Sequence, residues 1–342
     1  MKTRRPGLPT IEAVAQAAGV STATVSRTLN RPGAVREVLR KRVEEAVARL
    51  GYLPNAGARS MMLRRSGTIG AIFPTVDNAI FAKAIDALQG RLSEAGQQLL
   101  IATSNYDADA EMRQAVNLVA RGADGLALCG AGQRAELLAF LRQRRLPCVH
   151  VMSLTSDPLM NSVGFDNAGA MTRAVRYLLD LGHRRIAMLA GLTRDNDRAA
   201  ARVQGVRRAL HEAGIDLPAA RLVERRYGIA AARDGFAELI AARPAPTAIV
   251  CGNDVLAFGA LLEAQSRGLD VPKSLSIVGF DDLELANQLA PALTTVQVPT
   301  EAMWRLAADR LIAALRGESV PAHTVLDVQL VVRGSTGPAP RR

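Results

Sequence analysis

The sequence is poor in cysteine and contains no long apolar run. Its three cysteines, Cys129, Cys148 and Cys251, lie far apart and form no CxxC pair, which excludes a disulfide framework and is typical of a reduced cytoplasmic protein. No stretch of about 18 apolar residues is free of charges and turn residues, so the pattern excludes a membrane span. The basic stretch 1–7 is followed by Glu12 instead of an apolar segment, and we therefore expect no secretory signal and no membrane partner.

Motifs of enzymes and metalloproteins are also absent. Neither GxSxG nor HExxH occurs, and the histidines at positions 150, 183, 211 and 323 show no metal-ligand spacing. The segment Gly130–Ala135 fits the dinucleotide fingerprint GxGxxA, but that fingerprint belongs to a first βα unit and this segment follows a third apolar run. The next expected strand, 148–152, ends without an acidic residue for a ribose hydroxyl. We therefore predict no enzyme activity, no metal and no cofactor.

What the chain has is a basic head on a nearly neutral body. With 342 residues, 49% of them hydrophobic, it is long enough for two or three domains with buried cores. The first 65 residues hold thirteen Lys and Arg against four Glu, a net charge of +9 out of +11 for the chain. This asymmetry indicates a nucleic-acid-binding module on a carrier domain. A solubilising basic arm is the alternative, while a membrane-surface helix is disfavoured because the basic residues do not line one helical face.

The head carries the pattern of a helix-turn-helix. Thr10 can cap a first helix with apolar residues at 11, 14, 15 and 18, and Gly19 supplies the left-handed residue that ends it. Ser21 can cap a second helix, whose first turns would reach base edges in the major groove. The residues on these turns are Thr22, Ala23, Ser26 and Arg27. A third helix over 35–50 would complete the core.

Two stretches carry a family resemblance. GVSTATVSRTLN (19–30), followed by RLGYLPNAGARSM (49–61) and a sugar-binding-protein-like body, resembles the lactose repressor family of bacterial regulators over essentially the whole chain. The resemblance implies a DNA-binding domain at 1–53 and a hinge helix within 54–65 that enters the minor groove, with Met61 where the family wedges a leucine between base pairs. Gly57 weakens that helix by about 1 kcal/mol relative to alanine. The DNA contacts expected are Thr10, Ser21, Thr22, Ala23, Thr24, Ser26, Arg27, Asn30, Tyr52, Asn55, Arg59 and Met61.

After Ser66 short apolar runs alternate with helical segments, which predicts an α/β body of parallel sheets with helices on both faces. The runs are too many for one open sheet, so we expect two lobes. The resemblance implies a periplasmic-binding-protein-like body, 66–335, of two doubly wound lobes joined by three crossings, 66–164 with 292–322 and 165–291 with 323–335. We expect 336–342 to be a disordered tail. Since no leucine heptads follow Val332, we expect a homodimer and not a helix-tethered tetramer.

Polar and aromatic residues near the expected strand ends are candidates for a small-molecule site, because ligands of doubly wound sheets bind at the carboxyl ends of the strands. Arg202, Asn253 and Asp281 match the family's effector-contacting positions, and Tyr227 matches an aromatic that stacks on a sugar ring. The full set is Phe81, Phe165, Asp166, Arg198, Arg202, Tyr227, Asn253 and Asp281. Two alternatives stay open: a strand-end carboxylate is more often a helix cap, which is our interpretation of Asp254, and paired arginines are often simply solvated.

These groups suit a polyol or a sugar acid, because carboxylates and amides pair with hydroxyls and arginine forks a carboxylate. SLTSDP (153–158), VGFDNAG (163–169) and the segment 279–299 are similar to the gluconate-repressor branch, which implies gluconate or a ketogluconate. We predict a homodimeric transcription repressor that binds palindromic operator DNA and responds to a sugar or sugar-acid effector between its lobes. The alternatives are a solute-binding transport protein and a cytosolic sugar-binding protein or sugar-acid enzyme without a DNA role.

Overall fold

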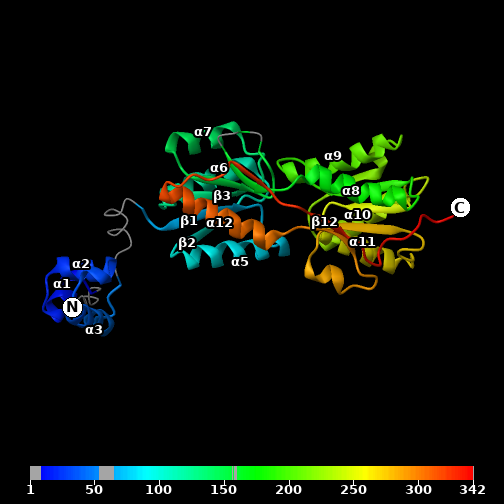
Figure 1. The fold of residues 1–342 in the computed structure, drawn as a ribbon. Helices are drawn as coiled ribbons and strands as arrows, with labels where there is room; N and C mark the ends of the chain where they lie inside the picture. Colours follow the sequence, from blue (N-terminus) through cyan, green and yellow to red (C-terminus); the bar gives the residue numbers. More distant parts are fainter. Residues whose placement is uncertain (1–8, 54–64, 156, 158–159, 342) are drawn as a thin grey trace, which may run out of the picture. The chain divides into compact units, whose positions relative to one another are not determined.

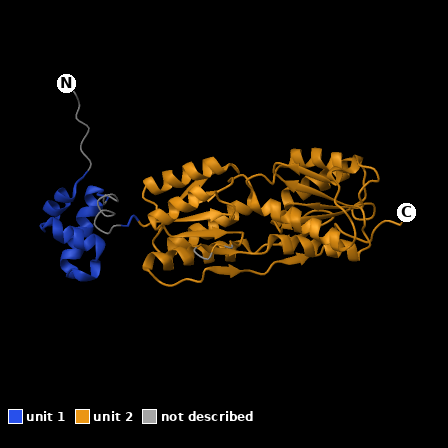
Figure 2. Cartoon of the chain, turned by 90° about the horizontal axis from the view of Figure 1, so that it is seen from above, with its two compact units in different colours: residues 1–66 blue, residues 67–342 orange. Residues whose placement is uncertain are grey.

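The computed structural model describes residues 9–53, 65–155, 157 and 160–341, which fall into two compact units, 1–66 and 67–342 (Figure 2). The first unit is the head and the second is the body. Within the described residues no helix combines the length and the apolar character that a membrane span requires.

The head is a three-helix unit with the expected turn. Its elements are α1 (Ile11–Ala18), α2 (Thr22–Asn30), the 3-10 turn η1 (Pro32–Ala34) and α3 (Glu37–Leu50). Gly19 ends α1 at a φ of 63°, a backbone conformation that suits glycine. Val14, Val25 and Val43, one from each helix, are completely buried. Their burial fixes the angle at which α2 leaves the turn.

The body contains two sheets, each covered by helices on both faces (Figure 1). Lobe one consists of β1 (Thr68–Phe73), α5 (Ala79–Glu94), β2 (Gln98–Thr103), α6 (Ala108–Ala120), β3 (Gly125–Cys129), α7 (Ala135–Arg144), β4 (Cys148–Val151), β5 (Asn161–Gly164), α12 (Thr300–Arg316) and β11 (His323–Val325). Its strand order is β11-β5-β4-β3-β1-β2, and all its pairs are parallel. On one face α12 packs beside α5, and the ring centroid of Trp304 of α12 lies 4.8 Å from that of Phe73 of β1, with the rings tilted by 33°.

Lobe two repeats this arrangement. It consists of α8 (Asn167–Asp180), β6 (Ile186–Gly191), α9 (Asp197–Glu212), the turn η2 (Ala219–Arg221), β7 (Leu222–Arg225), α10 (Ile229–Ala241), β8 (Ala248–Cys251), α11 (Asp254–Ser266), β9 (Ser276–Asp281), the turn η3 (Glu284–Asn287), β10 (Thr294–Gln297) and β12 (Gln329–Val331). The strand order is β12-β10-β9-β8-β6-β7, parallel except for β12 against β10. Helices α8 and α9 pack together, as do α10 and α11.

The expected lobe boundaries were wrong at two strands. We placed 292–322 in lobe one, but β10 pairs with β9 in the sheet of lobe two, so the second crossing comes after Gln297. We placed 323–335 in lobe two, but β11 pairs with β5 in lobe one, and the chain returns to lobe two only at β12. Both strands are short, and their parallel or antiparallel partners are set by tertiary pairing that the local pattern does not reveal.

The expectation of a disordered tail was also wrong for the described residues 336–341. The amide of Ala339 donates to the carbonyl of Leu181, and the carbonyl of Gly337 accepts from the Ser276 hydroxyl and lies 3.0 Å from Nε2 of His183. His183, predicted to be a turn residue, is completely buried by these contacts. The composition of this segment suggests disorder, but its backbone groups find partners on lobe two.

The strand order predicts which strand ends border a binding crevice. In each lobe the first strand lies between the second and the third, so the order in which successive strands join the sheet reverses at β1 in lobe one and at β6 in lobe two. Loops leaving the sheet on either side of such a reversal leave a crevice at the carboxyl ends of the strands. The loops after β1, β3, β6 and β8 are therefore the expected positions of a binding site.

Candidate functional site

One face of α2 is free for contact with another molecule. Thr22, Ala23 and Arg27 are exposed and Ser26 is half-buried, while Val25 and Thr28 are buried on the opposite side. Arg27 forms no ion pair among the described residues, whereas Arg40 and Lys41 of α3 pair with Glu44 and Glu37. This face matches the one that a second helix of a helix-turn-helix presents to a major groove.

Other predicted DNA residues serve the head itself. The Thr10 oxygen accepts from the amide of Ala13, and Ser21 Oγ accepts from the amide of Thr24 at 3.2 Å, so both residues cap helices as expected. Thr24 is half-buried and its hydroxyl lies 3.0 Å from Ser21 Oγ. Asn30 donates to the carbonyl of Ser26 within α2 and remains exposed.

Tyr52 does not lie where we expected a DNA contact. Only 9% of its surface is exposed, and it belongs to the apolar core of the head with Val14 and Val43. The reason is the left-handed Gly51, with a φ of 63°, after which the amide of Tyr52 donates back to the carbonyl of Val47. The predicted contacts Asn55, Arg59 and Met61, with Gly57 and most of the hinge segment, lie outside the described residues.

A cleft of about 660 Å³ opens at the carboxyl ends of the strands of the body. Both lobes supply its walls: Thr75, Asp77, Asn78, Asn105, Tyr106 and Asp107 from lobe one, and Leu192, Arg194, Asp195, Asn196, Glu224, Arg226 and Tyr227 from lobe two. The loop that carries Thr193 is fixed because its amide and hydroxyl donate to the Glu224 carboxylate at 2.8 to 3.1 Å. Most lining groups are polar, which suits a ligand rich in hydroxyls.

Beneath this cleft lies an inner space of about 20 Å³, lined by predicted effector residues. Phe81, Arg198, Arg202, Tyr227, Asn253 and Asp281 all border it. A volume of this size holds about one water molecule. The predicted site residues therefore converge on one point between the lobes, in an arrangement closed around very little free space.

Arg202 is the most firmly held of these side chains. Its Nε donates to Asn167 Oδ1 at 3.0 Å and its Nη1 donates to the carbonyl of Gly252 at 2.6 Å. The guanidinium carbon lies 3.7 Å from the ring centroid of Phe280, a cation–π contact, and Nη2 lies 3.9 Å from Asp281 Oδ1. Arg202 is thus oriented toward the inner space with two of its nitrogens already engaged.

Asp281 is a buried acid with an incomplete set of partners. It is 5% exposed, and its Oδ1 has no hydrogen-bond partner among the described residues. Burial raises the pKa of Asp281 from the ordinary 3.8 to about 7, with a further upward contribution from Asp254, while Arg202 and Arg198 pull it down. The group can therefore change charge near neutral pH. Among the described residues, no cluster of three His, Cys, Asp or Glu side chains is arranged to hold a metal ion.

Two aromatic rings meet at the cleft. Tyr106, in the loop after β2 of lobe one, lies 5.8 Å from Tyr227, in the loop after β7 of lobe two. Both rings line the cleft and the inner space, and Asn196 Nδ2 donates to the Tyr227 hydroxyl at 3.3 Å. Burial raises the pKa of Tyr106 far above the ordinary value of 10, so it stays neutral. The two lobes thus each contribute one aromatic ring to the wall of the cleft.

Comparison with known proteins places both units in one family. Residues 10–55 match the model for bacterial regulatory proteins of the lacI family, and residues 175–336 match the periplasmic binding protein-like domain. The HTH-type transcriptional regulator GntR of Pseudomonas aeruginosa is 34% identical, over 98% of this chain and 97% of that protein. Catabolite control protein A of Priestia megaterium is 32% identical, over 92% of this chain and 95% of that protein.

The chain belongs to the lacI family of bacterial regulatory proteins. A crystal structure of the lac repressor dimer bound to operator and the anti-inducer ONPF covers 97% of this chain, with all of that chain, at 27% identity and a TM-score of 0.87. A crystal structure of the transcription regulator GntR from Chromobacterium violaceum is 32% identical, over 79% of this chain and 99% of that chain, with a TM-score of 0.74. The protein is thus a LacI-family transcriptional repressor with DNA-binding and effector-binding domains. Its relatives are regulators and not enzymes, which confirms the prediction that it is not an enzyme.

In this LacI-family body, two predicted effector residues, Asp166 and Phe165, and the predicted helix cap, Asp254, have a different place from the one expected. Asp166 is exposed and accepts from the amide of Gly169, so it caps α8 and lines none of the spaces described above. Phe165 is buried and stacks 6.0 Å from Phe280, behind the site and not in its wall. Asn253, not Asp254, caps α11, because its Oδ1 accepts from the amide of Leu256.

Asp254 has a buried structural role instead. It is completely buried, and its two oxygens accept from the amide of Leu283 at 2.7 Å and the hydroxyl of Thr295 at 2.5 Å. Burial raises its pKa to about 6. It therefore ties the start of α11 to β10 and to the segment that follows β9.

Sequence reasoning missed three residues that border both the cleft and the inner space. These are Asn78, Tyr106 and Asn196. Each follows one of the expected strands within a few residues, so the rule that located Asn253 also applied to them. Asn78 and Asn196 are also the N-caps of α5 and α9, and this structural role is the one that their position in the sequence suggests first.

Proposed function

We propose that this repressor acts as a homodimer on a palindromic operator, and that a sugar or a sugar acid such as gluconate, bound between its lobes, controls its operator affinity. Two identical heads related by a two-fold axis match two half-sites of a palindrome. The name of the GntR relatives and the residues Arg198 and Arg202 beside the inner space support a carboxylated sugar. Since its target is chromosomal DNA, we place the protein in the cytoplasm.

The observation that carries this proposal is the cleft with polar walls from two lobes. A small hydroxylated molecule would reach hydrogen-bonding groups on both sides, including Asn78 in lobe one and Asn196 in lobe two, with Tyr106 and Tyr227 against its apolar edge. A ligand that contacts both lobes binds the closed arrangement better than an open one. It therefore shifts the equilibrium between the two, which is the requirement for an allosteric effector.

On the DNA side, we propose that the exposed face of α2 reads bases. Ala23 can offer only an apolar contact, such as one to a thymine methyl, while Arg27 can donate two hydrogen bonds to one guanine. Lys and Arg side chains of the basic head would bind phosphates and make the affinity fall steeply with salt. The hinge segment, including Asn55, Arg59 and Met61, would contact the minor groove in the same complex.

Operator binding is tested by selection of bound sequences from a random duplex library with the full-length protein at low salt. We expect an enriched palindrome, and a sedimentation experiment should give a complex of two chains on one duplex. Enrichment of a single half-site, bound by one chain, would contradict the dimer. Failure to enrich any sequence, with and without gluconate, would contradict the proposed operator binding.

The effector is tested by a thermal-shift screen of sugars and sugar acids. At a hundred times its dissociation constant, a ligand stabilises the folded chain by about 2.7 kcal/mol, which is readily visible as a higher Tm. We expect D-gluconate to raise the Tm and D-glucose, the matched neutral sugar, to raise it less. An equal or larger effect of glucose would contradict a carboxylate-binding site at Arg198 and Arg202.

A further inference from the structure

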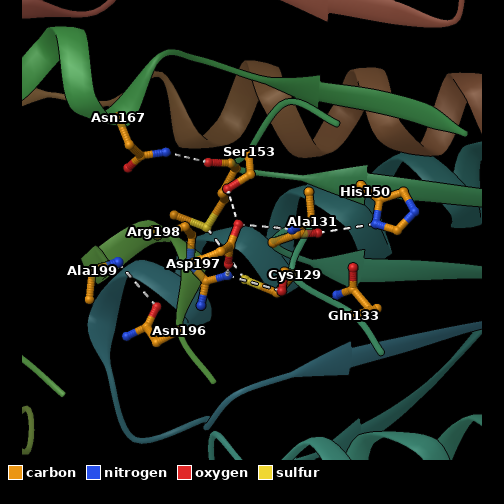
Figure 3. Close-up of polar contacts among 12 residues, drawn as sticks. Cys129, Ala131, Gln133, His150, Ser153, Asn167, Asn196, Asp197, Arg198 and Ala199 are labelled. Carbon is orange, nitrogen blue, oxygen red and sulfur yellow. Dashed lines mark hydrogen bonds and ion pairs between the residues drawn. The ribbon is translucent and has the colours of Figure 1, made fainter. Parts of the chain in front are cut away.

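Direct hydrogen bonds join the two lobes (Figure 3). Asp197 Oδ2, on the first residue of α9 in lobe two, accepts from the amide of Ala131 at 3.0 Å and from the hydroxyl of Ser153 at 2.7 Å, both in lobe one. Arg198 Nη1 donates to the carbonyl of Cys129, also in lobe one, at 3.0 Å. We call these five residues the interlobe bridge.

The charges of the interlobe bridge support one another. Arg198 Nη1 lies 3.0 Å from Asp197 Oδ1, and Arg198 is only 7% exposed. Burial raises the pKa of Asp197, but Arg198, the Ser153 hydroxyl and the Ala131 amide outweigh it and hold that pKa below the ordinary value. The carboxylate also lies at the positive end of α9. Asp197 is therefore ionised when it meets lobe one, and its hydrogen bonds are of the strong, charge-assisted kind.

The loop after β3, which contacts the start of α9, contains two glycines, Gly130 and Gly132, that allow this close approach. Gly130 has a φ of 93°, and a Cβ built on it would collide with Arg198 Nη1 and Asp197 Oδ1. A Cβ on Gly132 would lie 3.0 Å from the Cβ of Asp197, a distance at which a neighbour must shift. The GxG of the apparent dinucleotide fingerprint thus serves the approach of lobe two to lobe one.

We propose that the interlobe bridge holds the two lobes closed in the absence of effector, and thereby sets the fraction of chains ready to bind it. The bridge consists only of protein groups, so it needs no ligand to form. This inference rests on the proposed function in one respect, that the effector binds between the lobes. The apparent dissociation constant is the intrinsic one divided by the closed fraction. Breaking the bridge at Asp197, Ser153 or Gly130, which line neither the cleft nor the inner space, therefore weakens effector binding without removing a ligand contact.

The proposal also predicts the sign of the change in operator affinity when the interlobe bridge is lost. The effector and the bridge both favour the closed arrangement, so loss of the bridge acts on the same equilibrium with the opposite sign. Whatever the effector does to operator affinity, breaking the bridge without effector should do the reverse.

The lobe arrangement can be measured with spin labels on the full-length protein. Ala135 of lobe one and Ala230 of lobe two are exposed, each at the start of a helix that follows a strand, and Ala135→Cys with Ala230→Cys provides the labelling pair. The native cysteines Cys129, Cys148 and Cys251 are buried, and burial raises the pKa of their thiols, so they react poorly. Dilution with unlabelled chains limits the signal to distances within one chain.

Three variants break the bridge by different means: Gly130→Ala blocks the docking, Asp197→Asn removes the charge, and Ser153→Ala removes one donor. We expect each to lengthen the mean interlobe distance in ligand-free protein, with Ser153→Ala giving the smallest change. Gly96→Ala is the control for backbone strain, since Gly96 has a φ of 71° in lobe one with open space around it. Glu212→Gln is the control for the carboxylate, since Glu212 lies on α9 and pairs with Arg176 inside lobe two.

Unchanged distances in both Asp197→Asn and Ser153→Ala, which leave the glycine loop unaltered, would overturn the proposal. In a second arm, isothermal titration with D-gluconate should show binding weakened roughly tenfold in Asp197→Asn if the closed fraction falls to about a tenth. Lengthened distances with unchanged gluconate affinity would overturn the link between bridge and effector. Absence of gluconate binding to the wild type would refute the proposed ligand, while the ligand-free distances would still test the bridge.

Discussion

Replacing Asp281 by asparagine should remove a pH dependence from the stability of the body. Burial holds the pKa of this carboxyl near 7 in the folded chain, against 3.8 for an ordinary aspartate. Between these two values the folded chain keeps a proton that the unfolded chain has lost, so stability falls as pH rises from about 4 to about 7 and levels off above. A difference of roughly three pKa units corresponds to roughly 4 kcal/mol, at 1.36 kcal/mol per unit. Asparagine resembles the protonated acid and does not ionise.

The measurement is urea unfolding of wild type and Asp281→Asn at several pH values from 4 to 8. Trp304, the single tryptophan, is completely buried in lobe one and reports unfolding of the body, and circular dichroism tests whether the transition is two-state. We expect the variant to gain on the wild type as pH rises, by up to about 4 kcal/mol at pH 8. Asp254, with a pKa raised to about 6, contributes in the same direction to both proteins, and only its coupling to Asp281 does not cancel in the comparison.

The position of Arg202 explains why the pKa of Asp281 stays raised, and an exposed aspartate provides the control. Arg202 approaches Asp281 only to 3.9 Å and already donates to Asn167 and to the carbonyl of Gly252, so it offsets the burial of Asp281 only in part. Asp216→Asn, on the exposed surface of lobe two, controls for the chemical change itself. A constant difference between wild type and Asp281→Asn across the pH range would refute the reasoning.

Four further outcomes follow from the geometry. Removal of residues 1–66 should abolish operator binding in a mobility-shift assay and leave D-gluconate binding to the body intact, because the body is a compact unit of its own. Arg27→Ala should cost about 1–3 kcal/mol of operator affinity and relax selection at a single base position, which repeated library selection would reveal. Ser21→Ala removes the acceptor for the Thr24 amide and should destabilise the head by about 1 kcal/mol, seen by calorimetry. Arg202→Met should keep operator binding but lose the response to gluconate, and a retained response would remove Arg202 from the site.

Local patterns in the sequence predicted the head and the alternation of the body well, because both depend on short-range physics. The caps Thr10 and Ser21 and the left-handed Gly19 act within one helical turn, and the structure has all three where the sequence predicts them. The strand predicted at 68–73 has those bounds in the structure, since a continuous apolar run between turn residues is typical of a buried parallel strand.

The errors concern groups whose position depends on distant parts of the chain. The partner of β11 is β5, and the amide of Ala339 donates to the carbonyl of Leu181; in both cases the partner lies more than a hundred residues earlier in the chain. The partner of β10 is the nearer strand β9, but this pairing is also a tertiary contact. Tyr52 looks like a surface aromatic beside a basic segment, yet the turn at Gly51 directs it into the head core. The strand pairing and the docked tail are decided by tertiary contacts, which no local pattern reveals. For Tyr52 the turn is local, but the apolar core into which it directs the ring is formed by all three helices of the head.

In the candidate site, a polar residue that follows a strand can both cap a helix and border the binding space. Asn78, Asn196 and Asn253 each cap a helix with the side-chain oxygen, and each also borders the inner space. Asp166 caps a helix in the same way but borders none of the spaces described here. Capping and ligand contact are therefore compatible in one residue, and the sequence alone cannot rank the four. What separates them is the strand order, since Asn78, Asn196 and Asn253 follow β1, β6 and β8, at or next to the point where the strand order reverses, while Asp166 follows β5.

The segment Gly130–Ala135 illustrates the same point for glycine. A glycine pair after a buried strand indicates that something must approach the backbone closely, and a dinucleotide phosphate is one such partner. Here the partner is the first turn of α9, which brings a carboxylate to the amide of Ala131. A phosphate and an aspartate make the same demand, an anion at a backbone N–H with no Cβ in the way. The fingerprint therefore identifies the geometry of the loop correctly, while the origin of the anion follows only from the packing of the two lobes.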